Sequence, residues 1–368
     1  MKIGLNATCF NNRPSGAKQR FIGLYSQLFN LMRDSEFIVF QPSDCIMNHW
    51  FNSPNVKFVS TPIPSEGRLN KFFQGSTFWD QTLKNENLDL FECFNLPSVQ
   101  NSSAFTIQTI HDVRSLRENA SIIERMIGKY VHKTAIAKTN KIITVSQTMR
   151  DEILNYFPSA NIEFLYNGID LDNFVLPSSS DLDITKKKFS LPSNFLLSVG
   201  HFEHRKNYSN LIHAIKNLKE AGQDYFLVIV GNDNGNKNKI ADQIISLNLH
   251  KNIVLLSNLS DTEVKSIYAL STAFVFPSIY EGFGIPILES MAYNKPVILS
   301  DINVFKEITE DQGVYFDPKD IFSIEEKIRK VTEDSNLSSR LIEYGRKRVK
   351  EFDFKKLAPK LFDIYLSQ

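Results

Sequence analysis

The sequence has few of the features that mark exported or zinc-binding proteins. Its 368 residues include only three cysteines, Cys9, Cys45 and Cys93, with no Cys-x-x-Cys pair and no histidine at ligand spacing. This scarcity disfavours a disulfide framework and a structural zinc site, and it favours a reducing cytosol. We therefore expect no bound metal.

Charge of one sign and long apolar runs are also lacking. The 42 basic and 41 acidic residues leave a net charge of +1, whereas a nucleic-acid binder usually has a basic excess, so we expect no nucleic-acid partner. No run reaches the length of about 18 apolar residues that a membrane-spanning helix needs. Residues 1–10, MKIGLNATCF, alternate in polarity and predict a first strand rather than a signal peptide. The expected location is the cytoplasm.

Short apolar runs alternate along the chain with longer segments of helical periodicity. This alternation is typical of parallel sheets covered by helices, and the continuous run FLVIVG at 226–231 fits a strand buried on both faces. The predicted strands are 2–5, 37–40, 106–110, 141–145, 163–165, 195–199, 226–230, 252–256, 273–276 and 297–299. The clearest predicted helices are 17–31, 122–139, 210–220 and 261–270.

A change in composition divides the chain. Residues 170–193, DLDNFVLPSSSDLDITKKKFSLPS, are rich in Ser, Asp, Lys and Pro and poor in periodic apolar residues. This pattern predicts an interdomain linker, with a boundary near residue 176. We expect one domain over 1–176 and a second over 177–350.

The sharpest functional signal is the segment 277–296, PSIYEGFGIPILESMAYNKP. A strand ends at its start, a loop with Gly282 and Gly284 follows, and the next proline suits a first helical turn. Glycines allow a close backbone approach to a ligand, and a helix N-terminus suits a diphosphate. Glu281 and Glu289 can then face one cleft. The alternative is that Glu281 is a solvated loop charge and Glu289 a partner of the helix dipole.

A second segment, 196–211, reads LLSVGHFEHRKNYSNL. Its strand ends in Gly200, and the loop that follows contains Arg205 and Lys206. Cations at the carboxyl end of a parallel strand are well placed to hold phosphates. Two adjacent basic residues can equally be a solvated surface pair.

Together, VGHFEHRKN and PSIYEGFGIPILESMA resemble the two donor-site motifs of family 4 glycosyltransferases, and Glu281 and Glu289 match the Glu-x7-Glu pattern of that family. The resemblance extends over nearly the whole chain, through SGAKQRF (15–21), TIHDV (109–113), ITVSQTMRDEI (143–153) and YNGIDLDNF (166–174). It implies the GT-B fold, an α/β architecture of two Rossmann-like domains whose parallel sheets face an interdomain cleft. It also implies that a final helix in 351–368 crosses back to the N-terminal domain.

The resemblance implies a retaining transferase that uses a nucleotide sugar and no metal. Arg205 and Lys206 would neutralise the donor diphosphate, Glu289 would bind the ribose, and Glu281 would orient the sugar. Many members have arginine where this chain has His201, and Arg205 would supply that cation. The implied catalytic residues are His111, Arg205, Lys206 and Glu281. The implied donor-binding residues are Gly16, Gly200, Arg205, Lys206, Gly282, Phe283, Gly284, Ile285 and Glu289.

His111 ends a predicted strand, where cleft residues lie in open α/β sheets. A lone histidine at a strand end is by itself more often a structural or surface residue. The resemblance implies instead that His111 lies beside the reacting sugar. Asp112 would orient the strand end or cap the next segment.

By this resemblance the chain moves a hexose, with GDP-mannose the favoured donor, to a glycan or lipid-linked acceptor in surface polysaccharide or lipopolysaccharide biosynthesis. UDP and dTDP sugars stay open as donors. The alternatives are another enzyme on the same fold, such as a nucleotide-sugar epimerase or a glycogen-type synthase, and a two-lobe sugar-binding protein without catalysis.

Two groups of residues bear on the acceptor. The segment 122–139 contains the basic residues Arg125, Lys129, His132, Lys133 and Lys138, and Lys141 lies just beyond it. These predict either a solvated face or a peripheral contact with anionic lipid at the inner membrane face. The aromatic residues Trp50, Phe72, Phe73, Phe78 and Trp79 predict either core packing or an acceptor cleft.

Overall fold

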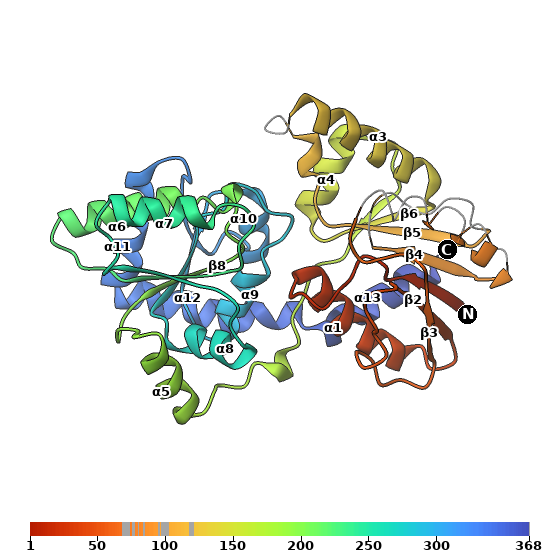
Figure 1. Ribbon diagram of the computed structural model, residues 1–368, viewed down its shortest axis with the longest axis horizontal. Coiled ribbons are helices and arrows are strands. Elements are labelled where there is room, and N and C mark those ends of the chain that lie inside the picture. Colours follow the sequence, from red (N-terminus) through yellow and green to blue (C-terminus); the bar gives the residue numbers. More distant parts are fainter. Residues whose placement is uncertain are drawn as a thin grey trace. The chain divides into compact units, whose positions relative to one another are not determined.

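The structure, a computed structural model, describes residues 1–67, 74–75, 78–79, 81–83, 85–94, 96, 103–117 and 121–367. It divides into two compact units (Figure 1). The first unit comprises Met1–Ile169 and Asp353–Gln368, and the second comprises Asp170–Phe352.

The first unit is built on a parallel seven-stranded sheet in the order β3-β2-β1-β4-β5-β6-β7. Its strands are β1 Lys2–Asn6, β2 Glu36–Gln41, β3 Val56–Ser60, β4 Leu90–Cys93, β5 Phe105–Ile110, β6 Lys141–Thr144 and β7 Ile162–Phe164. Its helices include α1 Gly16–Leu31, the 3-10 turn η1 Arg114–Leu116, α3 Ile122–Lys138, α4 Gln147–Tyr156 and α13 Phe354–Leu366. Because all strands run in parallel, the segments after β1, β4 and β5 leave the same edge of the sheet.

The last helix of the chain packs in the first unit. Helices α1 and α13 lie side by side (Figure 1). A Cβ atom added at Gly23 of α1 would lie 2.1 Å from the ring of Phe354, so this glycine permits the close approach. Phe354, Leu357 and Leu361 of α13 are buried in the same hydrophobic core as α1.

The second unit is built on a parallel six-stranded sheet in the order β10-β9-β8-β11-β12-β13. Its strands are β8 Leu196–Val199, β9 Leu227–Val230, β10 Ile253–Leu256, β11 Ala273–Phe276, β12 Val297–Ser300 and β13 Val314–Phe316. Its helices are α5 Ser179–Lys188, α6 Tyr208–Glu220, α7 Lys237–Ser246, α8 Asp261–Leu270, α9 Ile285–Ala292, α10 Asn303–Thr309, α11 Ile321–Glu333 and α12 Ser335–Arg348, with short 3-10 turns η2 Leu171–Asn173, η3 His204–Lys206 and η4 Val349–Phe352.

The strand order places the two sequence motifs next to each other. After β8 the chain proceeds outward to β9 and β10, and it then returns to β11 on the other side of β8. Strands β8 and β11 pair directly, with Ala273 opposite Leu196. This is a topological switch point, where ligands of open α/β sheets bind outside the carboxyl ends of the strands.

The α/β fold of two Rossmann-like domains is confirmed, and the structure contains three strands that were not predicted from the sequence. β3 is a half-exposed edge strand, β13 has only three residues, and β4 contains the buried charge of Glu92. None of the described helices is both long and apolar enough to cross a membrane.

The predicted linker at 170–193 is wrong as a description of that segment. It contains the helix α5, which packs against α8. Ser178 and Asp181 form a capping box at its N-terminus. The periodicity went unnoticed because Thr185 is the one residue of α5 that is buried. Asp170 likewise accepts from the backbone N–H of Asp172 at the start of η2. Asp170 and Asp181 therefore cap η2 and α5.

Candidate donor site

The loop after β8 turns sharply at Gly200. This glycine has φ +157°, and a Cβ atom there would lie 2.8 Å from Cε of Lys206. The hydroxyl of Tyr208 donates to the carbonyl oxygen of Gly200 at 2.8 Å and fixes the turn. The absent side chain thus lets Lys206 fold back over the end of β8.

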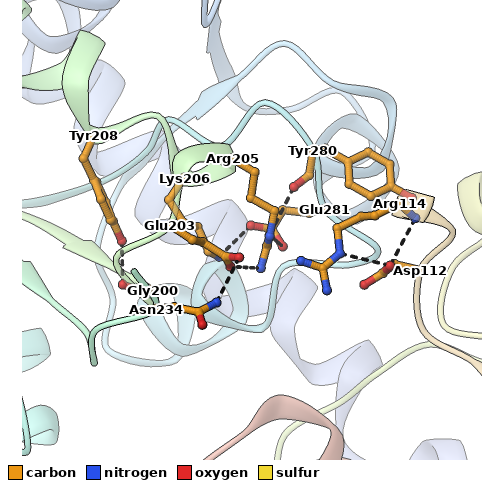
Figure 2. Close-up of polar contacts among 10 residues, drawn as sticks. All are labelled: Asp112, Arg114, Gly200, Glu203, Arg205, Lys206, Tyr208, Asn234, Tyr280 and Glu281. Atoms are coloured by element: carbon orange, nitrogen blue, oxygen red, sulfur yellow. Dashed lines mark hydrogen bonds and ion pairs between the residues drawn. The ribbon is translucent and has the colours of Figure 1, made fainter. Parts of the chain in front are cut away.

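Glu281 joins the two sequence motifs. Its Oε2 lies 2.6 Å from Nη1 of Arg205, and its Oε1 lies 2.6 Å from Nζ of Lys206 (Figure 2). Arg205 also pairs with Glu203 at 2.5 Å and donates to the carbonyl oxygen of Tyr280 at 3.2 Å. The structure therefore brings Arg205, Lys206 and Glu281 together at the carboxyl ends of β8 and β11.

These charges lie largely out of water. The side chain of Lys206 is 8% exposed and that of Glu281 is 10% exposed, so neither is a solvated surface charge. Burial lowers the pKa of Lys206. Burial would raise the pKa of Glu281, but the charges of Lys206 and Arg205 hold it below its usual value.

The cluster is formally neutral, because two cations face the carboxylates of Glu281 and Glu203. A diphosphate bound at this place would take over hydrogen bonds that Glu281 now accepts. Arginine can bind such an anion bidentately, while lysine acts as a point charge.

Helix α9 begins directly after this cluster. Its N-cap residue, Gly284, has φ +136°, a conformation that favours glycine, and no side chain caps the helix. Proline stands in the first turn. The backbone N–H groups of such an uncapped first turn, which includes Ile285, are donors for an anion. Gly282 and Phe283 lie in the loop between Glu281 and this helix.

Glu289, one turn into α9, has a different environment. It accepts a hydrogen bond of 2.7 Å from the hydroxyl of Tyr268 on α8, and burial raises its pKa. Tyr293 stacks on Tyr268 with ring centroids 5.6 Å apart. The hydroxyl of Tyr293 is buried without a partner among the described residues, and burial raises its pKa to about 12. Neither tyrosine was predicted from the sequence, because Tyr268 within α8 and Tyr293 at the end of α9 look like ordinary core residues.

Gly16 and His111 belong to the first unit. Gly16 opens α1, where Ser15 caps the helix by accepting from the backbone of Lys18 at 3.2 Å. His111 follows β5, and burial together with the charge of Arg20 lowers its pKa to about 4. The imidazole is therefore neutral at neutral pH and can exchange hydrogen bonds without carrying charge.

Two ionic groups surround the end of β5. Arg20 is buried and donates to the carbonyl oxygen of Tyr166 at 2.6 Å. Asp112 pairs with Arg114 at 3.1 Å (Figure 2). Asp112 also accepts from the backbone N–H of Arg114, the first residue of η1, at 3.2 Å.

A buried carboxylate supports the same strand. Glu92 of β4 accepts from the hydroxyl of Thr109 on β5 at 2.7 Å and from that of Tyr25 on α1 at 2.6 Å. The hydroxyl of Tyr365 on α13 also donates to it. Burial raises the pKa of Glu92. This network ties three elements to β5 just before His111, and its signal in the sequence is a charge inside the apolar run LFEC.

Some of the aromatic residues that were candidates for an acceptor cleft belong to the hydrophobic core. Trp79 is buried and packs edge-on against Phe40 at a centroid distance of 5.2 Å. Phe78 packs against the same cluster, while Trp50 is half-buried beside Lys18. Phe72 and Phe73 lie outside the described residues. Trp79 therefore serves packing.

Two family models match the chain in succession. The model described as Glycosyltransferase Family 4 matches residues 35–173, and the model described as Glycosyl transferases group 1 matches residues 179–348. The second match includes the whole cluster of Arg205, Lys206 and Glu281.

Similar known proteins include two mannosyltransferases and a solved structure. The chain is 30% identical over 249 residues to the O-antigen chain mannosyltransferase RfbU of Salmonella typhimurium. The aligned region covers 67% of this chain and 65% of RfbU. It is 29% identical over 246 residues to the serotype-specific mannosyltransferase WbdA of Escherichia coli. This aligned region covers 61% of this chain and 30% of WbdA. The chain thus matches about two thirds of the length of the first relative and under a third of the second. The sucrose-phosphate synthase of Thermosynechococcus elongatus superposes with a TM-score of 0.79 at 18% identity, over 100% of this chain and 98% of that one.

Proposed function

Since the chain belongs to the family 4-like glycosyltransferases of the GT-B fold, we propose that it transfers a hexose from a nucleotide sugar to a glycan or lipid-linked acceptor. The observation that carries the proposal is the meeting of Arg205, Lys206 and Glu281 at the uncapped start of α9. Two cations and a helix N-terminus stabilise the charge that develops on a departing diphosphate. They perform this task without a metal cofactor.

Each group has a proposed part in the reaction. Arg205, Lys206 and the amides at Gly284 and Ile285 hold the diphosphate, and Glu289 binds the ribose hydroxyls. Glu281, freed from at least one cation, orients the hexose. Neutral His111 shares a hydrogen bond with the same sugar.

The proposed stereochemical course is retention. The bond from the anomeric carbon to the diphosphate breaks, the acceptor oxygen bonds to the same face of that carbon, and the leaving phosphate oxygen takes the acceptor proton. The protein then contributes positioning and charge stabilisation and needs no nucleophile of its own.

GDP-mannose is the proposed donor, because both relatives are named as mannosyltransferases. The name of RfbU, an O-antigen chain enzyme, supports a part in surface polysaccharide synthesis. The proposed location is the cytoplasm. UDP and dTDP sugars are the competing donors.

A nucleotide panel tests the proposal without knowledge of the acceptor. Melting is followed with GDP, UDP, dTDP and ADP, and a ligand at 100 times its dissociation constant should stabilise the fold by ~2.7 kcal/mol. We expect GDP to give the largest shift. If none of the four nucleotides raises the melting temperature, the chain is not a nucleotide-sugar transferase. Product analysis after incubation with GDP-mannose alone separates a transferase from an epimerase, which would yield an altered sugar.

A further inference from the structure

Helix α3 exposes a continuous apolar face. Ile122, Ile123, Met126, Ile127 and Tyr130 are each 56–72% exposed. At 3.6 residues per turn these five positions fall within an arc of about 140° on one side of the helix. Ser121 and Glu124 form a capping box that fixes where the helix begins. Isolated exposed apolar residues are common, but a contiguous group on one face marks an interaction site.

This face points away from its own unit. The buried positions of α3 are Gly128, His132 and Ala135, which lie on the opposite side of the helix. A Cβ atom at Gly128 would lie 2.5 Å from Oγ of Ser115, so the inner side of α3 rests closely on η1. The packing of the unit therefore leaves the apolar face uncovered.

Cations flank the apolar face. Arg125, Lys129, Lys133 and Lys138 lie on α3, and the three lysines are exposed. Among the described residues, no ion pair joins Lys129 or Lys133 to a carboxylate. Glu124 is the single acidic residue of the helix, and its carboxylate is engaged by the backbone N–H of Ser121 at 2.9 Å.

Two of the basic residues expected on this face from the sequence do not lie there. His132 is buried, with Nδ1 2.8 Å from the carbonyl oxygen of Gly128. Lys141 is buried in β6 and pairs with Glu163 at 2.6 Å. What remains is an apolar strip bordered by exposed cations.

We propose that α3 is the surface by which the protein docks on an anionic lipid bilayer. Ile122, Ile123, Met126, Ile127 and Tyr130 enter the boundary between headgroups and acyl chains, while the lysines contact acidic headgroups. Apolar burial and attraction to anionic lipid together bind a helix of this kind in the plane of the interface. Charge complementarity favours lipid over a second copy of this chain, because two such faces would bring like charges together.

The docking surface has a structural link to the proposed reaction, and this step rests on the proposed function. η1, which supports the inner side of α3, begins at Arg114, two residues after Asp112 and three after His111. Because α3 rests on η1, a docked helix holds the carboxyl end of β5 at a fixed depth from the bilayer. A lipid-linked acceptor would then reach His111 without leaving the membrane.

The test is sedimentation of the full chain with vesicles of phosphatidylcholine alone or mixed with phosphatidylglycerol. The expected result is binding to the mixed vesicles and weaker binding to the neutral ones. The double variant Lys129→Glu, Lys133→Glu should bind the mixed vesicles at least about 30-fold more weakly, since each basic residue near an anionic surface contributes about 1 kcal/mol. The double variant Ile123→Asp, Ile127→Asp should also release the protein. These side chains are exposed, so the substitutions leave the core intact.

A matched control lies on α7 in the second unit, where Lys239 and Ile245 are exposed in the same way. The variant Lys239→Glu, Ile245→Asp should bind vesicles like the parent protein. Parent-like binding by both α3 variants, or equal binding to neutral and mixed vesicles, would overturn the proposal. The proposal would also be overturned if the parent protein were a dimer that does not bind vesicles and that the substitution Ile123→Asp dissociates. GDP-induced stabilisation, measured in parallel, reports on the donor site alone, so failure of docking and failure of the proposed function are distinguishable.

Discussion

The substitution Lys206→Met tests most directly whether the proposed donor site stabilises the departing diphosphate. Methionine keeps an unbranched chain near the ring of Phe276, whose centroid lies 4.7 Å from Nζ, and it removes the charge together with the hydrogen bond that Nζ donates to Glu281. Glu281 keeps its 2.6 Å pair with Arg205, so no carboxylate is left buried without a cation. The free energy of unfolding should therefore fall by less than the ~3–5 kcal/mol typical of a broken buried pair.

The effect on transfer should be much larger. Removing one preorganised group that stabilises developing charge lowers kcat by roughly 10²–10³-fold, or about 2.7–4 kcal/mol. The assay is the initial rate of GDP release from GDP-mannose with acceptor, alongside denaturant unfolding. Lys295→Met is the matched control, because Lys295 is half-buried and donates to the carbonyl oxygen of Ala269 at 2.7 Å, with no acidic partner among the described residues.

Glu281→Gln completes a double-mutant cycle. In the parent protein Glu281 occupies both cations, so the effects of the two substitutions on GDP affinity should not add. If Lys206→Met turns over at the parent rate while remaining folded, Lys206 does not stabilise the leaving group and the assignment of the donor site is refuted.

Three further predictions concern Glu289, Gly200 and His111. Glu289→Gln should weaken GDP binding by roughly 10–100-fold, because a hydrogen bond to a charged group contributes ~1.5–3 kcal/mol. Dideoxy-GDP, which lacks the ribose diol, should bind the parent protein and the variant equally well. An equal loss of affinity for both nucleotides would contradict the ribose contact. Gly200→Ala places a Cβ atom 2.8 Å from Cε of Lys206, so GDP affinity and melting temperature should both fall. GDP affinity is measured by titration calorimetry. An unchanged affinity would show that the turn at Gly200 is not part of the site. The folded pKa of His111 is about 4 against 6.5 for a free histidine, so its stabilisation is complete above pH 6.5 and is lost as the pH falls towards 4. His111→Gln should flatten that part of the curve of unfolding free energy against pH, and an unaltered curve would show that the imidazole is not desolvated.

Much of the fold follows from the alternation of apolar runs and helical segments. Runs such as FLVIVG are long enough to indicate buried parallel strands from the sequence alone. β4 escaped prediction because Glu92 interrupts its apolar run, and the partners that make this charge tolerable, Tyr25 and Tyr365, come from distant parts of the chain. α5 was mistaken for a linker because it buries almost none of its side chains.

The cluster of Arg205, Lys206 and Glu281 was predictable in its members but not in its contacts. The two motifs indicated Arg205, Lys206 and Glu281, and the pairing of β8 with β11 explains why they meet. The sequence analysis assigned the cations to phosphate and Glu281 to sugar, and nothing in the spacing shows that the carboxylate bonds both cations. The partnership of Glu289 with Tyr268 has no local signal either, since α8 and α9 are brought together only by the fold.

The most direct measurement is a crystal structure of the protein with GDP bound. We expect the diphosphate oxygens to lie within hydrogen-bond distance of Lys206, Arg205 and the first amides of α9. Glu281 should be released from at least one cation, and Glu289 should contact the ribose. A diphosphate bound elsewhere, with Glu281 still bonded to both cations, would contradict this expectation.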